Sequence, residues 1–133
     1  MNITYSKLTI SILLFVFAFT LSKANNIPNE LVVCFKTGNS KALANYFFSN
    51  IELQVLEDEN VYSKAQAEQI IKRFFEQNKP ADFVILHQSG KDGSEYAIGT
   101  LHTSTGKFRV YFLLKTQGAS KYIHQLTIKK ENG

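Results

Sequence analysis

Residues 82–129 read DFVILHQSGKDGSEYAIGTLHTSTGKFRVYFLLKTQGASKYIHQLTIK, and they determine the architecture. Apolar and polar residues alternate here with a period of two, which is typical of strands with one buried face. Turn-forming residues interrupt the alternation at Gly90–Gly93, Ser104–Gly106 and Gln117–Ala119. The pattern predicts an antiparallel meander of four strands. The strands lie near 82–89, 94–103, 107–115 and 121–129.

The clearest helix precedes this meander. Ser63 and Gln66 form a capping box, and Pro80 ends the segment. The apolar positions between them recur at i, i+3, i+4, i+7 and i+8, as on one face of a helix. They are Ala67, Ile70, Ile71, Phe74 and Phe75. A sheet with one apolar face needs a cover, so we expect this Phe-rich helix to lie on the meander.

Two short helices and a strand pair come before the long helix. The first helix begins near Asn26 and stops at Gly38, and the second runs from Asn39 or Ser40 to about Phe48. Residues 51–56 alternate as a strand, and 61–62 begin a return strand. The fold class is therefore α+β, with helices packed on a curved antiparallel sheet in the order α-α-β-β-α-β-β-β-β.

The N-terminus has the three parts of an export signal. Lys7 supplies the positive charge, residues 8–21 form an apolar run, and Ser22 and Ala24 are small residues before a cut at Asn25. A run of 14 residues is shorter than the roughly 20 needed to cross a bilayer, which disfavours a retained anchor. We expect a signal peptide at 1–24, a single domain at 25–133, and a secreted or periplasmic location.

A lipid-modified Cys34 is a further alternative, but this residue lies well past the apolar run and follows the bulky Val33. Because Cys34 is the only cysteine, no intramolecular disulfide can form, and a small buried apolar residue is the favoured interpretation. Loss of Lys7 and Lys23 leaves 13 basic against 11 acidic residues, a net charge of +2. That excess predicts no nucleic-acid partner.

The chain resembles the nuclear transport factor 2-like superfamily, also called ketosteroid isomerase-like. The resemblance covers residues 26–130 and rests on the element order and on the stretches 27–39, 62–67 and 72–75. Within the superfamily, the chain most resembles a secreted family of unknown function from Bacteroidetes-type bacteria. The resemblance implies a cone that encloses a pocket, and dimers through the outer sheet face. The isomerase chemistry needs an Asp base with Tyr and acid partners, a set that this sequence does not supply.

Pairing across Ser104–Gly106 places Ala97, Gly99 and Leu101 on the core face, opposite Phe112, Val110 and Phe108. The small Ala97 and Gly99 leave room for the long helix or for a hollow. His124 lies on the same side of its predicted strand as Leu126 and Ile128, so its side chain should point inward. If a pocket exists, we expect its lining to include the four residues His124, Tyr122, Ala97 and Gly99.

The opposite face is too apolar for a plain solvated surface. Its predicted residues are Phe83, Ile85, His87, Tyr96, Ile98, Thr100, Arg109, Tyr111 and Leu113. Aromatic and aliphatic groups with an Arg among them are typical of contact surfaces. The interface candidates are His87, Tyr96, Ile98, Arg109 and Tyr111. Alternatively, a loop or the N-terminal segment covers this face.

No catalytic, cofactor or metal motif occurs in the sequence, since His87, His102 and His124 lack ligand spacing. Three functions are therefore compared. The first is binding of a small apolar molecule or peptide in the cone. The second is dimerisation or protein interaction through the outer face. The third, less expected, is an enzyme whose pocket acid or base the sequence does not identify.

Overall fold

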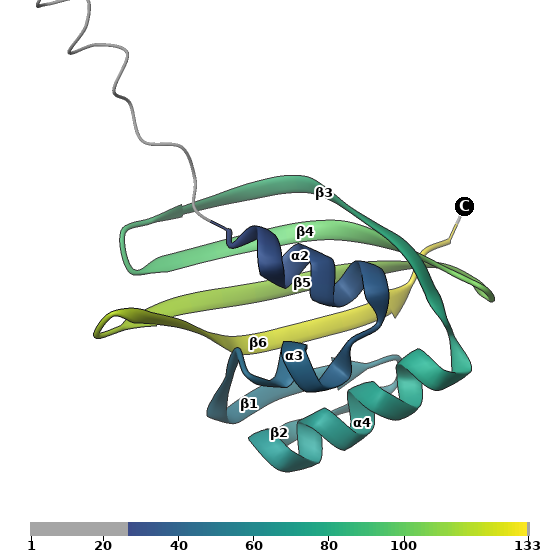
Figure 1. The fold of residues 1–133 in the computed structure, drawn as a ribbon, viewed down its shortest axis with the longest axis horizontal. Coiled ribbons are helices and arrows are strands. Elements are labelled where there is room, and N and C mark those ends of the chain that lie inside the picture. Colours follow the sequence, from purple (N-terminus) through teal and green to yellow (C-terminus); the bar gives the residue numbers. More distant parts are fainter. Residues whose placement is uncertain (1–26, 133) are drawn as a thin grey trace, which may run out of the picture.

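The computed structural model describes residues 27–132, so the predicted signal peptide lies outside the described residues. Figure 1 shows helices packed on one side of a curved sheet. The helices are α2 (Asn29–Thr37), α3 (Ser40–Ala44) and α4 (Lys64–Gln77). The strands are β1 (Phe47–Val55), β2 (Asp58–Ser63), β3 (Pro80–Lys91), β4 (Ser94–Thr103), β5 (Gly106–Gln117) and β6 (Ser120–Lys130).

The first two helices are joined by a tight turn at Gly38. Gly38 has a φ of 68°, which lies in the left-handed region, and its N–H donates hydrogen bonds to the carbonyls of Cys34 and Phe35, as at many helix C-termini. The side chain of Asn39 then caps α3 by accepting from the N–H of Ala42. The second helix is shorter than predicted, because Phe47 already pairs with β6 as the first residue of β1.

The long helix α4 has the predicted capping box. The Ser63 hydroxyl accepts from the backbone N–H of Gln66, and the Gln66 side chain accepts from the N–H of Ser63. The helix ends at Gln77, where the side-chain amide of Asn78 donates to the carbonyl of Phe74. Ala67, Ile71, Phe74 and Phe75 are buried, as the apolar stripe predicts.

The sheet has six strands in the order β2-β1-β6-β5-β4-β3. The strands of the meander pair antiparallel, and so do β1 and β2. However, β1 and β6 run parallel, so the predicted antiparallel sheet is in fact mixed. No turn joins these two strands, because β2, α4 and the first three strands of the meander lie between them in the sequence. Local turn signals therefore cannot specify their relative direction.

We call the side of the sheet that carries the helices the inner face and the opposite side the outer face. The prediction that α4 covers the meander is only partly right. Helix α2 lies on β3, whereas α4 packs mainly against α3, β1 and β2 (Figure 1). The meander receives Phe74 of α4, whose ring meets Phe108 of β5 edge-on at 5.0 Å. The cover is therefore divided between two helices.

Candidate binding face

The inner face is filled at the place where the sequence allows a hollow. Gly99 has no free space beside it, because an added Cβ would lie 2.6 Å from the Phe83 ring. Phe83 in turn packs on Phe35 of α2, with ring centroids 4.8 Å apart, and Phe35 stacks on Phe112 at 5.6 Å. Ala97 is fully buried in the same core. The space at Gly99 is thus occupied by aromatic rings and not by a ligand pocket.

His124 and Tyr122 do not join Ala97 and Gly99. The register of β5 and β6 shifts at His124, because Leu113 pairs with Gln125 and the next residue, Leu114, pairs with Ile123. As a result Ile123, and not His124, is buried in the core. The imidazole of His124 instead stacks on Phe48, at 4.2 Å and 19°, and Tyr122 meets the same ring at 6.1 Å. The four predicted pocket residues are therefore divided between two places.

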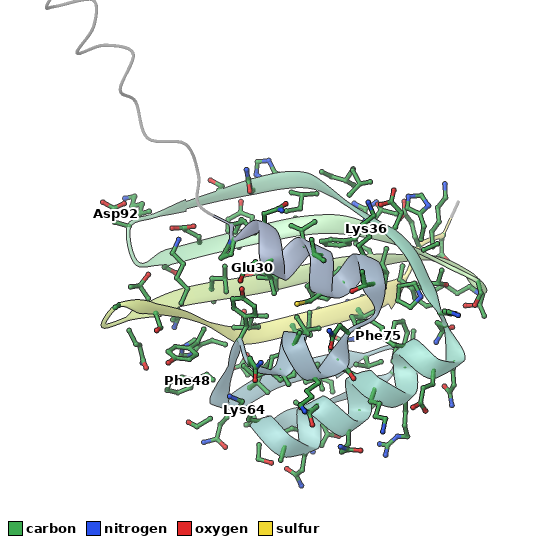
Figure 2. All side chains as sticks on the ribbon, in the orientation of Figure 1. Glu30, Lys36, Phe48, Lys64, Phe75 and Asp92 are labelled. Carbon is green, nitrogen blue, oxygen red and sulfur yellow. The ribbon has the colours of Figure 1, made fainter. Side chains whose placement is uncertain are left out.

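Figure 2 shows Phe48 at the end of the sheet that also carries the β3–β4 turn with Asp92. Phe48 was predicted to be helical, and the signal that identifies it as a strand residue is the apolar spacing from Phe47 to Ile51 and Leu53. Within the described residues, Nε2 of His124 is buried and has no hydrogen-bond partner. Burial, reinforced by the charge of Lys115, lowers the pKa of His124 below its ordinary 6.5.

The outer face carries the predicted contact residues of β4 and β5. Ile98 lies opposite Tyr111, and Tyr96 opposite Leu113, as the predicted register requires. The rings of Tyr96 and Tyr111 are 6.0 Å apart. Burial, with a smaller effect of Tyr96, raises the pKa of Tyr111. We call Tyr96, Ile98, Tyr111 and Leu113 the aromatic patch.

His87 borders the aromatic patch from β3, as predicted. Its Nε2 lies 3.4 Å from the hydroxyl of Tyr96, and the two rings are 5.9 Å apart. Thr100 and Arg109 continue the same face as the next pair along the two strands. The structure thus brings together all five predicted interface residues, His87, Tyr96, Ile98, Arg109 and Tyr111.

The outward placement of Phe83 and Ile85 is wrong. The β3–β4 register shifts between Ile85 and His87, so Leu86 is an extra residue that reverses the alternation. Phe83 is buried and Ile85 packs against the core. Their place on the outside is taken by Val84 and Leu86, which are 44% and 55% exposed.

Charge divides the outer face into two halves. Exposed basic residues flank the aromatic patch, and they are Lys107, Arg109, Lys115 and Lys129. On β1 and β2 the face is acidic and polar, with Glu52 and Glu59 beside a groove of about 330 Å³ that Gln54, Gln125 and Thr127 also line. Gln125 donates to Glu52 across the parallel pair of strands. One side of the face is therefore positive and the other negative.

A second groove, of about 430 Å³, lies between α2 and α3. Its walls include Val33, Cys34, Ala42 and Tyr46, and the hydroxyl of Tyr46 donates to Glu30 at 3.3 Å. Cys34 is buried, as predicted, and burial followed by the charge of Glu30 raises the pKa of its thiol. A raised pKa reduces the fraction of reactive thiolate, so the structure does not favour Cys34 as a nucleophile.

No three His, Cys, Asp or Glu residues between 27 and 132 gather closely enough to hold a metal ion. Over the same residues, no helix combines the length and the hydrophobicity needed to cross a bilayer.

Comparison with known proteins places this geometry among related structures. A family model described as "Domain of unknown function (DUF4783)" matches residues 28–129. A DUF4783 protein from Bacteroides ovatus ATCC 8483 is 34% identical, with a TM-score of 0.77, over 83% of this chain and 100% of that chain. One from Bacteroides uniformis ATCC 8492 is 31% identical, with a TM-score of 0.77, over 81% and 100%.

A third solved structure, Rd1NTF2_04 with long sheet, is 17% identical and has a TM-score of 0.62. The match covers 75% of this chain and 94% of that chain, and it shows likeness of fold alone. It supports the nuclear transport factor 2-like fold that the sequence predicts, and the Bacteroides structures support the predicted bacterial group. A comparison with curated proteins found no match.

Proposed function

Because this chain belongs to the DUF4783 family, whose function is unknown, we propose from its surface that it is an interaction module of the extracytoplasmic space that pairs with a second copy of itself. The outer face is the contact surface. The aromatic patch supplies apolar area to that contact, and the acidic and basic parts of the face set its orientation.

The observation that carries this proposal is the contrast between the two faces of the sheet. On the inner face, Phe83 and Phe35 fill the space beside Gly99. On the outer face, the aromatic patch is only half-buried, and Val84 and Leu86 extend the apolar surface to the edge strand. Contiguous apolar surface with a charged rim is typical of protein interfaces. Filling of the core leaves ligand binding in the cone, the leading expectation from the sequence, with less support.

A second copy fits this face because its charges are self-complementary. In a two-fold contact between sheets, an axis that runs along the strands between β1 and β6 places β6 and β5 of one copy opposite β1 and β2 of the other. The basic side around Lys115 and Lys129 would then meet the acidic side around Glu52 and Glu59. Complementary charges fix the orientation of a contact and favour it over other orientations. The superfamily resemblance also implies dimers through this face.

Sedimentation velocity of residues 25–133 tests the proposal directly. We expect a reversible dimer in the micromolar range, weakened by salt because the two halves attract across the contact. Ile98→Glu places a charge in the aromatic patch and should raise the dissociation constant at least about tenfold. Val33→Glu is the matched control, since Val33 is 43% exposed but lies on α2.

Circular dichroism verifies that both variants keep their fold. A strict monomer at about 1 mM would overturn the proposal, since it would mean a free energy of association weaker than about 4 kcal/mol. A dimer that Ile98→Glu leaves intact would place the contact elsewhere and would equally contradict it.

A further inference from the structure

A carboxylate already lies against hydrogen-bond donors and basic side chains on the outer face. Thr100 of β4 and Arg109 of β5 lie directly opposite each other, and both reach Glu131, which follows the end of β6. Nη2 of Arg109 donates to Oε1 of Glu131 at 3.0 Å. The hydroxyl of Thr100 donates to Oε2 at 3.3 Å. Both carboxylate oxygens are therefore recognised by separate donors.

The two residues that donate to Glu131 are built into the sheet. Thr100 is 7% exposed and is the one buried polar residue in the described part of the chain. A buried hydroxyl needs a hydrogen-bond partner, and the partner here is Glu131. Arg109 lies on β5 between Thr100 and Lys129 of the two neighbouring strands. The positions of both donors are thus fixed by backbone pairing on each side.

The carboxylate side is held more weakly. Glu131 lies beyond β6, and its backbone makes one hydrogen bond, from its N–H to the carbonyl of Lys107 at 3.0 Å. Its side chain is 28% exposed, and an ion pair that solvent reaches contributes little stability. Glu131 can therefore leave while Thr100 and Arg109 stay in place.

The positive charge around Glu131 exceeds what one carboxylate neutralises. Lys107 and Lys129 are exposed beside Arg109, and Lys107 acts on Glu131 through its charge. The hydrogen bond from Arg109 is the main cause that lowers the pKa of Glu131, because it stabilises the charged carboxylate. The site suits an anion and retains positive potential even when Glu131 is bound.

We propose that Thr100 and Arg109, with Lys107 beside them, form a carboxylate-binding site, and that Glu131 is an intramolecular occupant that an external carboxylate replaces. The ligand class is a carboxylate with an apolar group attached. The apolar group is specified by the neighbouring pair, since Ile98 and Tyr111 lie two residues along from Thr100 and Arg109 on the same face. A peptide C-terminus that ends in an apolar residue has this chemistry.

The proposed dimer would bury Ile98 and Tyr111, so binding is measured at a protein concentration at which sedimentation velocity finds the monomer. N-acetyl-leucine supplies a carboxylate beside an apolar side chain, and N-acetyl-leucinamide is the matched neutral probe. Amide chemical shifts of Thr100, Lys107 and Arg109 are followed by nuclear magnetic resonance in residues 25–133 and in the Glu131→Ala variant. We expect the acid to bind the variant about tenfold more tightly, because the competing occupant is gone.

Two further variants make the result specific. Arg109→Gln in the Glu131→Ala background should abolish binding of the acid. Lys91→Gln in the same background should leave binding unchanged, since Lys91 is an exposed cation at the far end of β3, away from Thr100 and Arg109. Equal shifts with acid and amide, or no gain in affinity from Glu131→Ala, would show that Glu131 is only a structural pin and would overturn the proposal.

Discussion

Gly99 is the residue at which the packing of the inner face can be tested most sharply. An added Cβ would lie 2.6 Å from Cζ of Phe83 and 2.8 Å from the carbonyl oxygen of Val84. Both distances are far inside van der Waals contact, so the core must shift to admit a methyl group. We expect Gly99→Ala to lower the free energy of unfolding by about 1–3 kcal/mol in urea denaturation.

A second substitution shows whether the Phe83 ring is the cause. Phe83→Leu in the Gly99→Ala background removes the ring atoms that the new methyl group meets, and the two changes should be less than additive in a double-mutant cycle. The rescue should be partial, because the Val84 carbonyl is backbone and remains. Additive costs would mean that a cavity, and not the ring, lies beside Gly99.

His124 makes stability depend on pH through its stacked, half-buried ring. Burial and Lys115 lower its pKa below 6.5 in the folded protein, so the unfolded chain binds the proton more readily. The stabilisation is complete above pH 6.5 and is lost as the pH falls through and below that value. We expect the urea midpoint to fall between about pH 7.5 and 5.5.

The His124→Phe variant separates this effect from other titrations. Phenylalanine can still stack on Phe48, and it removes the buried Nε2 that has no hydrogen-bond partner within the described residues. The variant should therefore be at least as stable at neutral pH and should lose most of the pH dependence in this window. A slope that survives the substitution would assign the pH dependence to another group.

The β4–β5 hairpin could be predicted residue by residue, because its turn fixes its register. The turn at Ser104–Gly106 allows one register in which Leu101 and Phe108 are buried side by side, and the structure has that register. β3 could not be predicted in the same way. Phe83 to Leu86 is an uninterrupted apolar run that fits either parity, and the bulge at Leu86 is set by packing against α2 and β4.

The same limit applies where strands distant in the sequence meet. β6 contains a register shift at His124, and β1 and β6 pair in parallel with a second shift between Phe47 and Glu52. Neither shift lies at a turn, so the sequence near it carries no signal for the change of register. The pocket prediction that placed His124 inward failed for this reason, whereas the outer face of β4 and β5 was predicted correctly.

At the scale of the whole molecule, the inner face of the sheet is filled and the outer face is half-buried. This contrast favours self-association over ligand binding in the cone. The sequence alone could identify the apolar outer face, since alternation reports parity within each strand. It could not report whether the space at Gly99 was filled, because Phe83 and Phe35 approach from elements that are distant in the sequence. Nor could it pair Glu131 with Thr100, which is 31 residues away.

The start of the folded domain limits where an export signal can be cut. Ile27 packs against the core, and α2 begins at Asn29, so a cut that spares the domain must fall before Ile27. The predicted cut after Ala24 meets this condition. We expect intact-mass measurement of the exported protein to give a chain that starts at Asn25, and Ala24→Phe to block processing, because signal peptidase requires a small residue there. An exported chain that still begins at Met1 would contradict the signal peptide, and with it the extracytoplasmic part of the proposed function.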